Sequence, residues 1–152
     1  MRSRCICDPT MEMIPYLSPT SQEVLSMVSS LVRILEDGPA CSQYDIFGFF
    51  SAPRRELTIC NSRILGIGYP DRDFNETLMH ESVHVAQACR AQFRDLRAFG
   101  IKRSAMPLSA AKAADLKKVL AFDAQLAQVD REAFYMENKP ELVRYVVRKY
   151  CF

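Results

Sequence analysis

The sequence predicts an α+β fold that is mostly helical, with a small β-hairpin packed beside one central helix. Apolar residues recur at helical spacing in several stretches, and two short runs rich in aromatic and β-branched residues flank a polar loop that contains Pro53. One helical stretch is apolar almost all round, which is typical of a buried helix. Because 152 residues is the size of one domain, we expect residues 1–152 to form a single unit.

The N-terminal part is expected to be an irregular arm followed by a helix. Residues 1–19 contain three prolines and therefore predict the arm. Thr20 or Ser21 suits a helix N-cap, and apolar residues then recur at helical spacing, so we predict a helix at about 21–36. This helix should end at the Asp37-Gly38-Pro39 turn.

Two short runs predict the β-hairpin. Residues 44–50 are rich in aromatic side chains, residues 57–60 are β-branched or apolar, and the loop between them contains a proline. The next apolar run, 64–69, is ambiguous between helix and strand because two glycines interrupt it.

The central helix is predicted to begin near Phe74. Asp73, with Glu76 three positions later, has the form of a capping box in which aspartate replaces serine or threonine. The helix should continue to about Leu96 or Phe99. Its middle is apolar nearly all round, so its remaining polar face must open onto something polar, and a metal-binding cleft would satisfy it.

The second half of the chain is predicted to be helical after a loop at 100–108. Ser109 suits an N-cap, and helix-forming residues continue from it to Met136. Pro140 suits the first turn of a last helix. The buried stripe of that helix is predicted to be Leu142, Val143, Val146 and Val147.

Composition and charge argue against several classes of function. A net charge of +2, with basic residues spread along the chain, argues against a nucleic-acid partner. No run of 18 apolar residues and no signal-like start are present, so we expect no membrane span and a cytoplasmic location. The six cysteines are widely spaced, which favours reduced thiols over a disulfide framework, and Cys5 with Cys7 is only a weak metal-knuckle pattern.

Both histidines of the chain fall in one HExxH motif, formed by His80, Glu81 and His84. Residues four apart lie on one face of a helix, so the two imidazoles can converge on a single ion, with Glu81 beside them. Neutral imidazole is a good zinc ligand, and a catalytic zinc site needs a nearby carboxylate to accept a proton from the activated water. The motif predicts Zn²⁺ held by His80 and His84, with Glu81 as the catalytic base.

Chance alone would produce this HExxH arrangement in about one in a thousand chains of this composition. The alternative that stays open is a buried helix with two core histidines whose hydrogen bonds are satisfied by the protein. Gln87 lies one turn after His84 on the same face, and it is either a hydrogen-bond partner of the metal ligands or a surface glutamine.

A catalytic zinc usually has three protein ligands, so a third must come from elsewhere in the chain. Since the chain has no third histidine, a carboxylate or a cysteine is required. The stretch 130–137 offers carboxylates at Asp130 and Glu132.

The chain resembles the gluzincin metallopeptidases, in particular the minigluzincins and related HExxH proteins of bacteria and phages. The resemblance rests on the hairpin with Gly48-Phe49-Phe50 and residues 57–60, on the motif at 77–87, and on the block at 130–137. It implies a zincin-like fold in which an edge strand binds the substrate backbone. It also implies a downstream helix, with a glutamate-x-x-alanine type pattern, that supplies the third ligand.

Register and residue type disagree about that ligand. The family register, three residues before the packing alanine Ala133, points to Asp130, whereas Glu132 has the family's residue type and the longer reach. Two positions differ by about 200° around a helix, so both carboxylates cannot easily reach one ion. We expect Glu132 to be the third ligand, because its residue type and its reach suit the site slightly better, and Asp130 is the alternative.

The function expected from these residues is a small soluble zinc-dependent metallopeptidase that hydrolyses peptide bonds in a protein or peptide substrate. Tyr135 and Tyr145 are available as donors to the developing oxyanion, but nothing in the sequence assigns either one. The main alternative is a catalytically inactive structural or interaction protein of zincin fold, such as a phage or host accessory protein acting in the host cytoplasm. A repressor-cleaving regulator is less favoured, because no second domain is evident to sense a signal. The sequence leaves the oligomeric state open.

Overall fold

The computed structural model describes residues 11–120 and 126–152, and within them the fold is α+β, with helices dominating one small sheet. The first half of the predicted arm, the Cys5 and Cys7 pair, and residues 121–125 of the predicted long helix lie outside the described residues.

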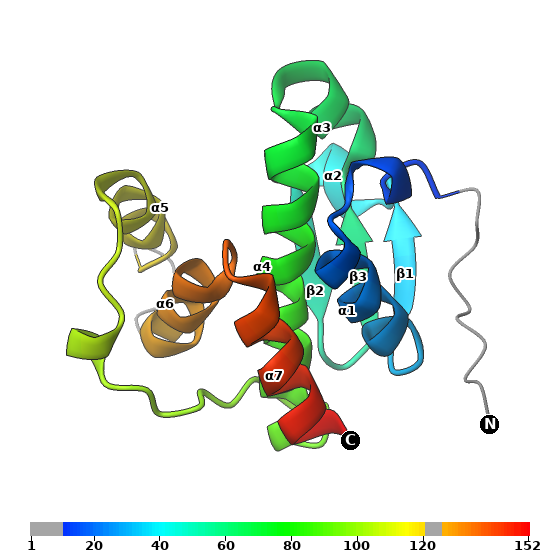
Figure 1. The fold of residues 1–152 in the computed structure, drawn as a ribbon. Helices are drawn as coiled ribbons and strands as arrows, with labels where there is room; N and C mark the ends of the chain where they lie inside the picture. The colour runs from blue at the N-terminus through cyan, green and yellow to red at the C-terminus, as the bar shows by residue number, and fades with distance from the viewer. Residues whose placement is uncertain (1–10, 121–125) are drawn as a thin grey trace.

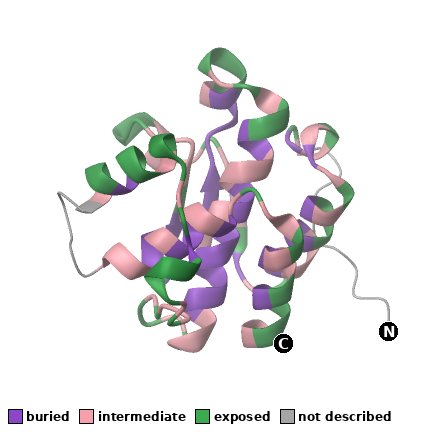
Figure 2. Ribbon diagram, turned by 60° about the vertical axis from the view of Figure 1, so that its left-hand side comes forward, coloured by how far each residue is buried: buried purple, intermediate pink, exposed green. Residues whose placement is uncertain are grey.

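One helix, α4 (Pro70–Arg90), is the axis of the molecule. Figure 1 shows α1 and the sheet on one side of α4 and α5 and α6 on the other. Figure 2 shows that buried residues gather in the middle of the molecule. The other described elements are η1 (Ile14–Tyr16), α1 (Pro19–Ser29), β1 (Arg33–Glu36), α2 (Ala40–Gln43), β2 (Gly48–Ser51), β3 (Glu56–Ile59), α3 (Asn61–Ile67), η2 (Arg103–Ala105), α5 (Ala110–Leu120), α6 (Ala127–Met136) and α7 (Pro140–Cys151).

The sheet has the strand order β1-β3-β2. The predicted hairpin is confirmed, because β2 pairs antiparallel with β3, with Phe50 opposite Leu57. The predicted helix at 21–36 is wrong at its end, because Arg33–Glu36 is β1, parallel to β3. The physical reason is that β3 offers a second edge whose backbone groups pair with this segment, a non-local gain that outweighs local helical periodicity.

The start of the fold is more ordered than the predicted arm. Met13 and Leu17 are buried in the core, and Asn75 of α4 holds this segment by bonds to Tyr16 O (2.8 Å) and from Ser18 N (2.9 Å). Ser18, rather than Thr20 or Ser21, is the N-cap of α1. Packing against α4 therefore orders residues 13–18, which the prolines in the sequence predicted to be irregular.

The predicted central helix is confirmed as α4, but both of its predicted ends are wrong. It begins at Pro70, where Asp73 lies one turn inside the helix and accepts a hydrogen bond from Tyr69 N (2.7 Å). It ends at Arg90 rather than near Leu96 or Phe99, because Gln92 and Phe93 adopt left-handed φ values of 53° and 59° and turn the chain away.

The second half of the chain is helical as predicted, but the predicted unbroken helix from Ser109 to Met136 is wrong, because α5 and α6 are separate helices that pack against each other. Ser109 caps α5 by accepting a hydrogen bond from Lys112 N (3.2 Å). The last helix begins at Pro140, and its buried face carries Val143, Val146 and Val147, whereas Leu142, also predicted to be buried, is only partly so. The ambiguous run at 64–69 is divided between α3 and the turn before α4. Among the described residues, no helix combines the length and apolar character needed to cross a membrane.

Two disulfides overturn the expectation of reduced thiols for four of the cysteines. Cys41 is joined to Cys60, with Cα atoms 5.5 Å apart, and Cys89 is joined to Cys151 at 5.4 Å. Wide spacing in sequence misled the prediction because the fold brings the end of α7 beside α4 and α2 beside the end of β3. Disulfides persist in oxidising surroundings, so these bonds point to such conditions for the folded chain.

We expect the disulfide between Cys89 and Cys151 to stabilise the fold by about 2–4 kcal/mol, because a bridge across a long loop restricts the unfolded chain. The bridged residues are 62 positions apart, against 19 for Cys41 and Cys60. Replacing Cys89 and Cys151 by alanine should lower the free energy of unfolding in urea by that amount, and by more than the same change at the other pair. Equal unfolding curves for the wild type and this variant would contradict the expectation.

At Gly48, β2 passes very close to α4. A Cβ atom there would lie 2.5 Å from Thr77 Cγ2 and 3.2 Å from Glu81 Cγ, and both residues belong to the motif helix. The strand can approach the helix this closely only because residue 48 has no side chain.

Gly48→Ala should destabilise the protein by about 1–3 kcal/mol, because the added methyl group overpacks the contact. Adding Thr77→Ser, which removes the nearest methyl group, should recover part of the loss. Gly66→Ala is the matched control, since nothing lies within 4 Å of its new Cβ atom in α3. That change should stabilise the helix by about 0.5–1 kcal/mol. Thermal or urea unfolding tests the three variants, and a neutral Gly48→Ala would refute the close approach.

Candidate metal centre

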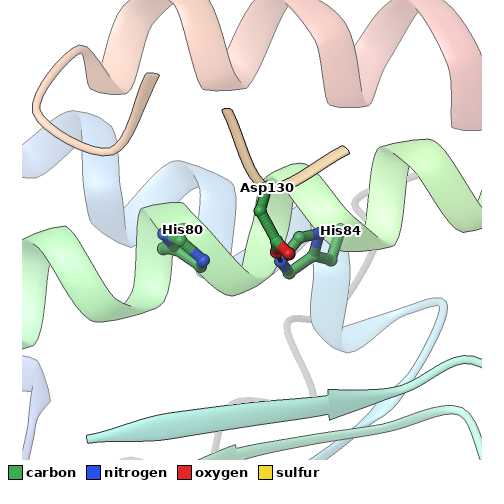
Figure 3. A group of neighbouring side chains, drawn as sticks. All are labelled: His80, His84 and Asp130. Carbon is green, nitrogen blue, oxygen red and sulfur yellow. Dashed lines mark ion pairs between the residues drawn. The ribbon is translucent and has the colours of Figure 1, made fainter. Parts of the chain in front are cut away.

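Three side chains from two helices converge at the middle of α4. His80 and His84 lie one turn apart on the same face of α4, and Asp130 reaches them from α6 (Figure 3). One ligand atom from each of the three lies within 4.8 Å of the others. His84 Nε2 is 3.4 Å from Asp130 Oδ1, and both side chains are largely buried.

This donor set fits a zinc ion. Two ligand atoms that each lie about 2.0–2.2 Å from a tetrahedral ion are about 3.3–3.6 Å apart. The 3.4 Å between His84 Nε2 and Asp130 Oδ1 falls in that range, and the donor atoms of all three residues lie within 4.8 Å of one another. Two histidines and one carboxylate leave a fourth tetrahedral position for water.

Glu132, the carboxylate preferred from the sequence as third ligand, does not join this cluster. It is fully buried on another side of α6 and accepts five hydrogen bonds of 2.8–3.2 Å. The donors are the side-chain amides of Gln87 and Gln128 and the backbone N–H groups of Phe99, Gly100 and Ile101. The preference for Glu132 is corrected in favour of Asp130, because the 200° between them turns only one toward the histidines.

The alternative of two satisfied core histidines fits His84 better than His80. His84 is buried and its Nδ1 lies 2.7 Å from Gln87 Oε1. His80 is half-buried, its ring packs edge-on against Phe134 at 4.7 Å, and none of the hydrogen bonds among the described residues involves its ring. Since the ring of His80 also lines a cleft, its nitrogen atoms are available to a ligand.

Gln87 is buried, so the alternative of a surface glutamine is wrong. Its side chain is fully buried and lies between His84 and Glu132, bonded to both. It is therefore a hydrogen-bond partner of the candidate ligands.

Burial and neighbouring charges shift the pKa values of three groups at the site. Burial, with the nearby charge of His84, holds the pKa of His80 well below its usual value, so that ring is neutral and free to bind a metal. Burial also lowers the pKa of His84, but the hydrogen bond to Asp130 and the charges of Glu81 and Asp130 outweigh it and raise the pKa. Burial raises the pKa of Glu81 to about 7, against the opposing effect of His84.

A cleft of about 410 Å³ opens beside the cluster, between β2 on one side and α5 and α6 on the other. Gly48, Thr77, His80, Glu81 and Phe134 line it close to the metal site. Neither Tyr135 nor Tyr145, the two candidate oxyanion donors, is among its lining residues, and Tyr145 is exposed on α7. The cleft gives a ligand access to Glu81 and His80 but not to those tyrosines.

The sequence reasoning missed Glu137, which also lines this cleft. It lies seven residues after Asp130, two helical turns on, so its spacing alone places it on the same side of α6. Burial raises its pKa to about 8, although Lys112, whose Nζ lies 3.8 Å from its carboxylate, opposes the shift.

Glu137→Gln should stabilise the metal-free protein at alkaline pH. The pKa of Glu137 is about 8 in the folded state, above its value of 4.5 in the unfolded chain. The contribution of its protonated form to stability is therefore fully present below pH 4.5 and is lost as the pH rises through 8. The variant should match the wild type near pH 4.5 and exceed it by about 1–3 kcal/mol near pH 9, measured by urea unfolding. Glu12→Gln, at an exposed position, is the control. A difference that does not change with pH would contradict this expectation.

Comparison with known families finds a match over most of the chain. A family described as "Domain of unknown function (DUF8637)" matches residues 13–152, which is most of the chain. Comparison with the curated proteins and with the solved structures finds no match.

Proposed function

We propose that this chain, which belongs to the DUF8637 family, is a small zinc-dependent metallopeptidase of zincin-like fold. The observation that carries the proposal is the convergence of His80, His84 and Asp130 beside Glu81 at the wall of a cleft. The motif, the burial and the spacing of the donor atoms support a common role for these four residues. Asp130 takes the place of the glutamate that the resemblance to gluzincins implies.

His80, His84 and Asp130 would hold the ion. Zinc in such a site lowers the pKa of water to near neutrality and polarises a carbonyl group. Glu81 would accept the proton released by that water and pass it to the leaving amine. A carboxylate with a pKa of about 7 suits both steps near neutral pH, because it can then accept a proton and release it again with similar ease.

The edge strand β2 supports a peptide as the substrate. It lies at the outside of the sheet, where β3 is its one hydrogen-bonded neighbour among the described strands, and its first residue, Gly48, lines the cleft next to Glu81. An extended peptide that adds to a free sheet edge is held by its backbone. A peptide paired with β2 would therefore pass over the motif helix with its carbonyl groups near His80 and Glu81.

Glu81→Gln should separate metal binding from hydrolysis. The purified wild type should contain about one zinc ion per chain and cleave a mixed library of quenched fluorescent peptides. The variant should keep the zinc, because Glu81 is not a ligand, and lose about 10²–10⁴-fold in cleavage rate, because the proton acceptor is gone. Zinc binding without cleavage in the wild type would favour the inactive interaction protein, and a wild type that binds no zinc would refute the proposal.

Asp130→Ala should abolish tight zinc binding, because the site would retain only two protein ligands. Asp115→Ala is the matched control, since Asp115 lines the same cleft without belonging to the ligand cluster. Zinc content after dialysis should fall in the first variant and stay at the wild-type value in the second. Retention of zinc by both variants would exclude Asp130 as a ligand.

A further inference from the structure

We propose that Gln87 and Glu132 form a positioning pair that holds the His84 ring in one tautomer, with the proton on Nδ1 and the lone pair of Nε2 directed to the metal. The inference deepens the proposed zinc site and rests on it. It gives a role to two fully buried polar side chains that contribute no ligand to the His80, His84 and Asp130 cluster.

The pair is an unbroken chain of hydrogen bonds from the ligand to α6. Gln87 follows His84 by three residues on α4, and its Oε1 lies 2.7 Å from His84 Nδ1. Its Nε2 lies 3.0 Å from Glu132 Oε1 and 3.0 Å from Val129 O. Every polar atom of the Gln87 side chain therefore has a partner.

The chemistry of these partners determines the direction of every bond. A backbone carbonyl only accepts, and the Glu132 carboxylate is already the acceptor of four other N–H groups, so the atom of Gln87 that faces them must be the NH₂ group. The atom that faces His84 is then the carbonyl oxygen, which only accepts. His84 Nδ1 must consequently be the donor, and a neutral ring then carries no proton on Nε2.

An unprotonated Nε2 faces another acceptor. Asp130 Oδ1 lies 3.4 Å away, and two acceptors at that distance in a buried site need either a proton or a metal ion between them, so a bound zinc ion would replace the proton that His84 can share with Asp130. The spacing is that of two ligands on one tetrahedral zinc ion. The pair thus prepares His84 to bind a metal ion together with Asp130.

Glu132 also sets the distance between the two helices that supply ligands. Its carboxylate binds Gln87 of α4 and the N–H groups of residues 99–101, while its own backbone belongs to α6, which carries Asp130. A change at Glu132 would therefore disturb both the ring of His84 and the approach of Asp130. A change at Gln87 would remove only the first contact, so Gln87 is the better residue to test.

The tautomer can be measured without any variant. Imidazole ¹⁵N shifts of the metal-free wild type, recorded at a pH at which the ring is neutral, should show a protonated Nδ1 and an unprotonated Nε2 for His84. In Gln87→Met, which has similar volume and no acceptor oxygen, the preference should weaken or reverse. A wild-type His84 with its proton on Nε2 would overturn the proposal, and this outcome does not depend on whether the variant folds.

Zinc affinity, measured by competition with a chelator, is the second test. Gln87→Met should weaken zinc binding by about 10–100-fold, the usual effect of removing a partner that orients a histidine ligand. Gln128→Met is the matched control, because Gln128 also donates to Glu132 (3.1 Å) but does not contact His84, and its affinity should stay within about threefold of wild type.

The two proposals fail in different ways. A wild type that binds no zinc overturns the metal site and with it the role of the pair. A wild type that binds zinc, with a folded Gln87→Met variant of equal affinity and the same His84 tautomer, overturns only the role of Gln87 and Glu132. Equal losses in Gln87→Met and Gln128→Met would also overturn it, because they would indicate a general weakening of the fold.

Discussion

The buried carboxylate of Glu132 is the interaction on which the candidate site depends. A charged group without solvent costs several kcal/mol unless donors surround it, and five N–H groups surround this one. Those donors come from α4, from the segment 99–101 and from α6 itself. Satisfying one carboxylate therefore brings together the helix with the histidines, the crossing segment and the helix with Asp130.

The same requirement explains why α4 ends where it does. The chain must leave the helix early for the N–H groups of residues 99–101 to reach α6, and the left-handed residues Gln92 and Phe93 make that turn. On the opposite side of α4, Gly48 lets β2 approach Thr77 and Glu81 closely. The cleft lies between β2, which comes close to α4 at Gly48, and α6, which the buried carboxylate of Glu132 ties to α4.

Local chemistry was sufficient for the features that depend on a few neighbouring residues. The hairpin, the cap at Ser109 and the last helix from Pro140 follow from turn residues, capping side chains and short-range periodicity, and the structure confirms them. Strand β1, the end of α4 and the two disulfides were mispredicted because each depends on a partner distant in sequence. Periodicity over residues 21–36 reports apolar positions but not the open edge of β3 that pairs with them.

The sequence by itself determined the motif: two histidines four apart, a glutamate between them, and a helix with one polar face, because helical geometry requires no other part of the chain. It also limited the third ligand to a carboxylate or a cysteine, with Asp130 and Glu132 as the two candidates. Only the tertiary structure shows which of the two faces the histidines. The rotation of α6 about its axis is set by packing and by the donors that Glu132 must find, and that rotation leaves Asp130 facing His84.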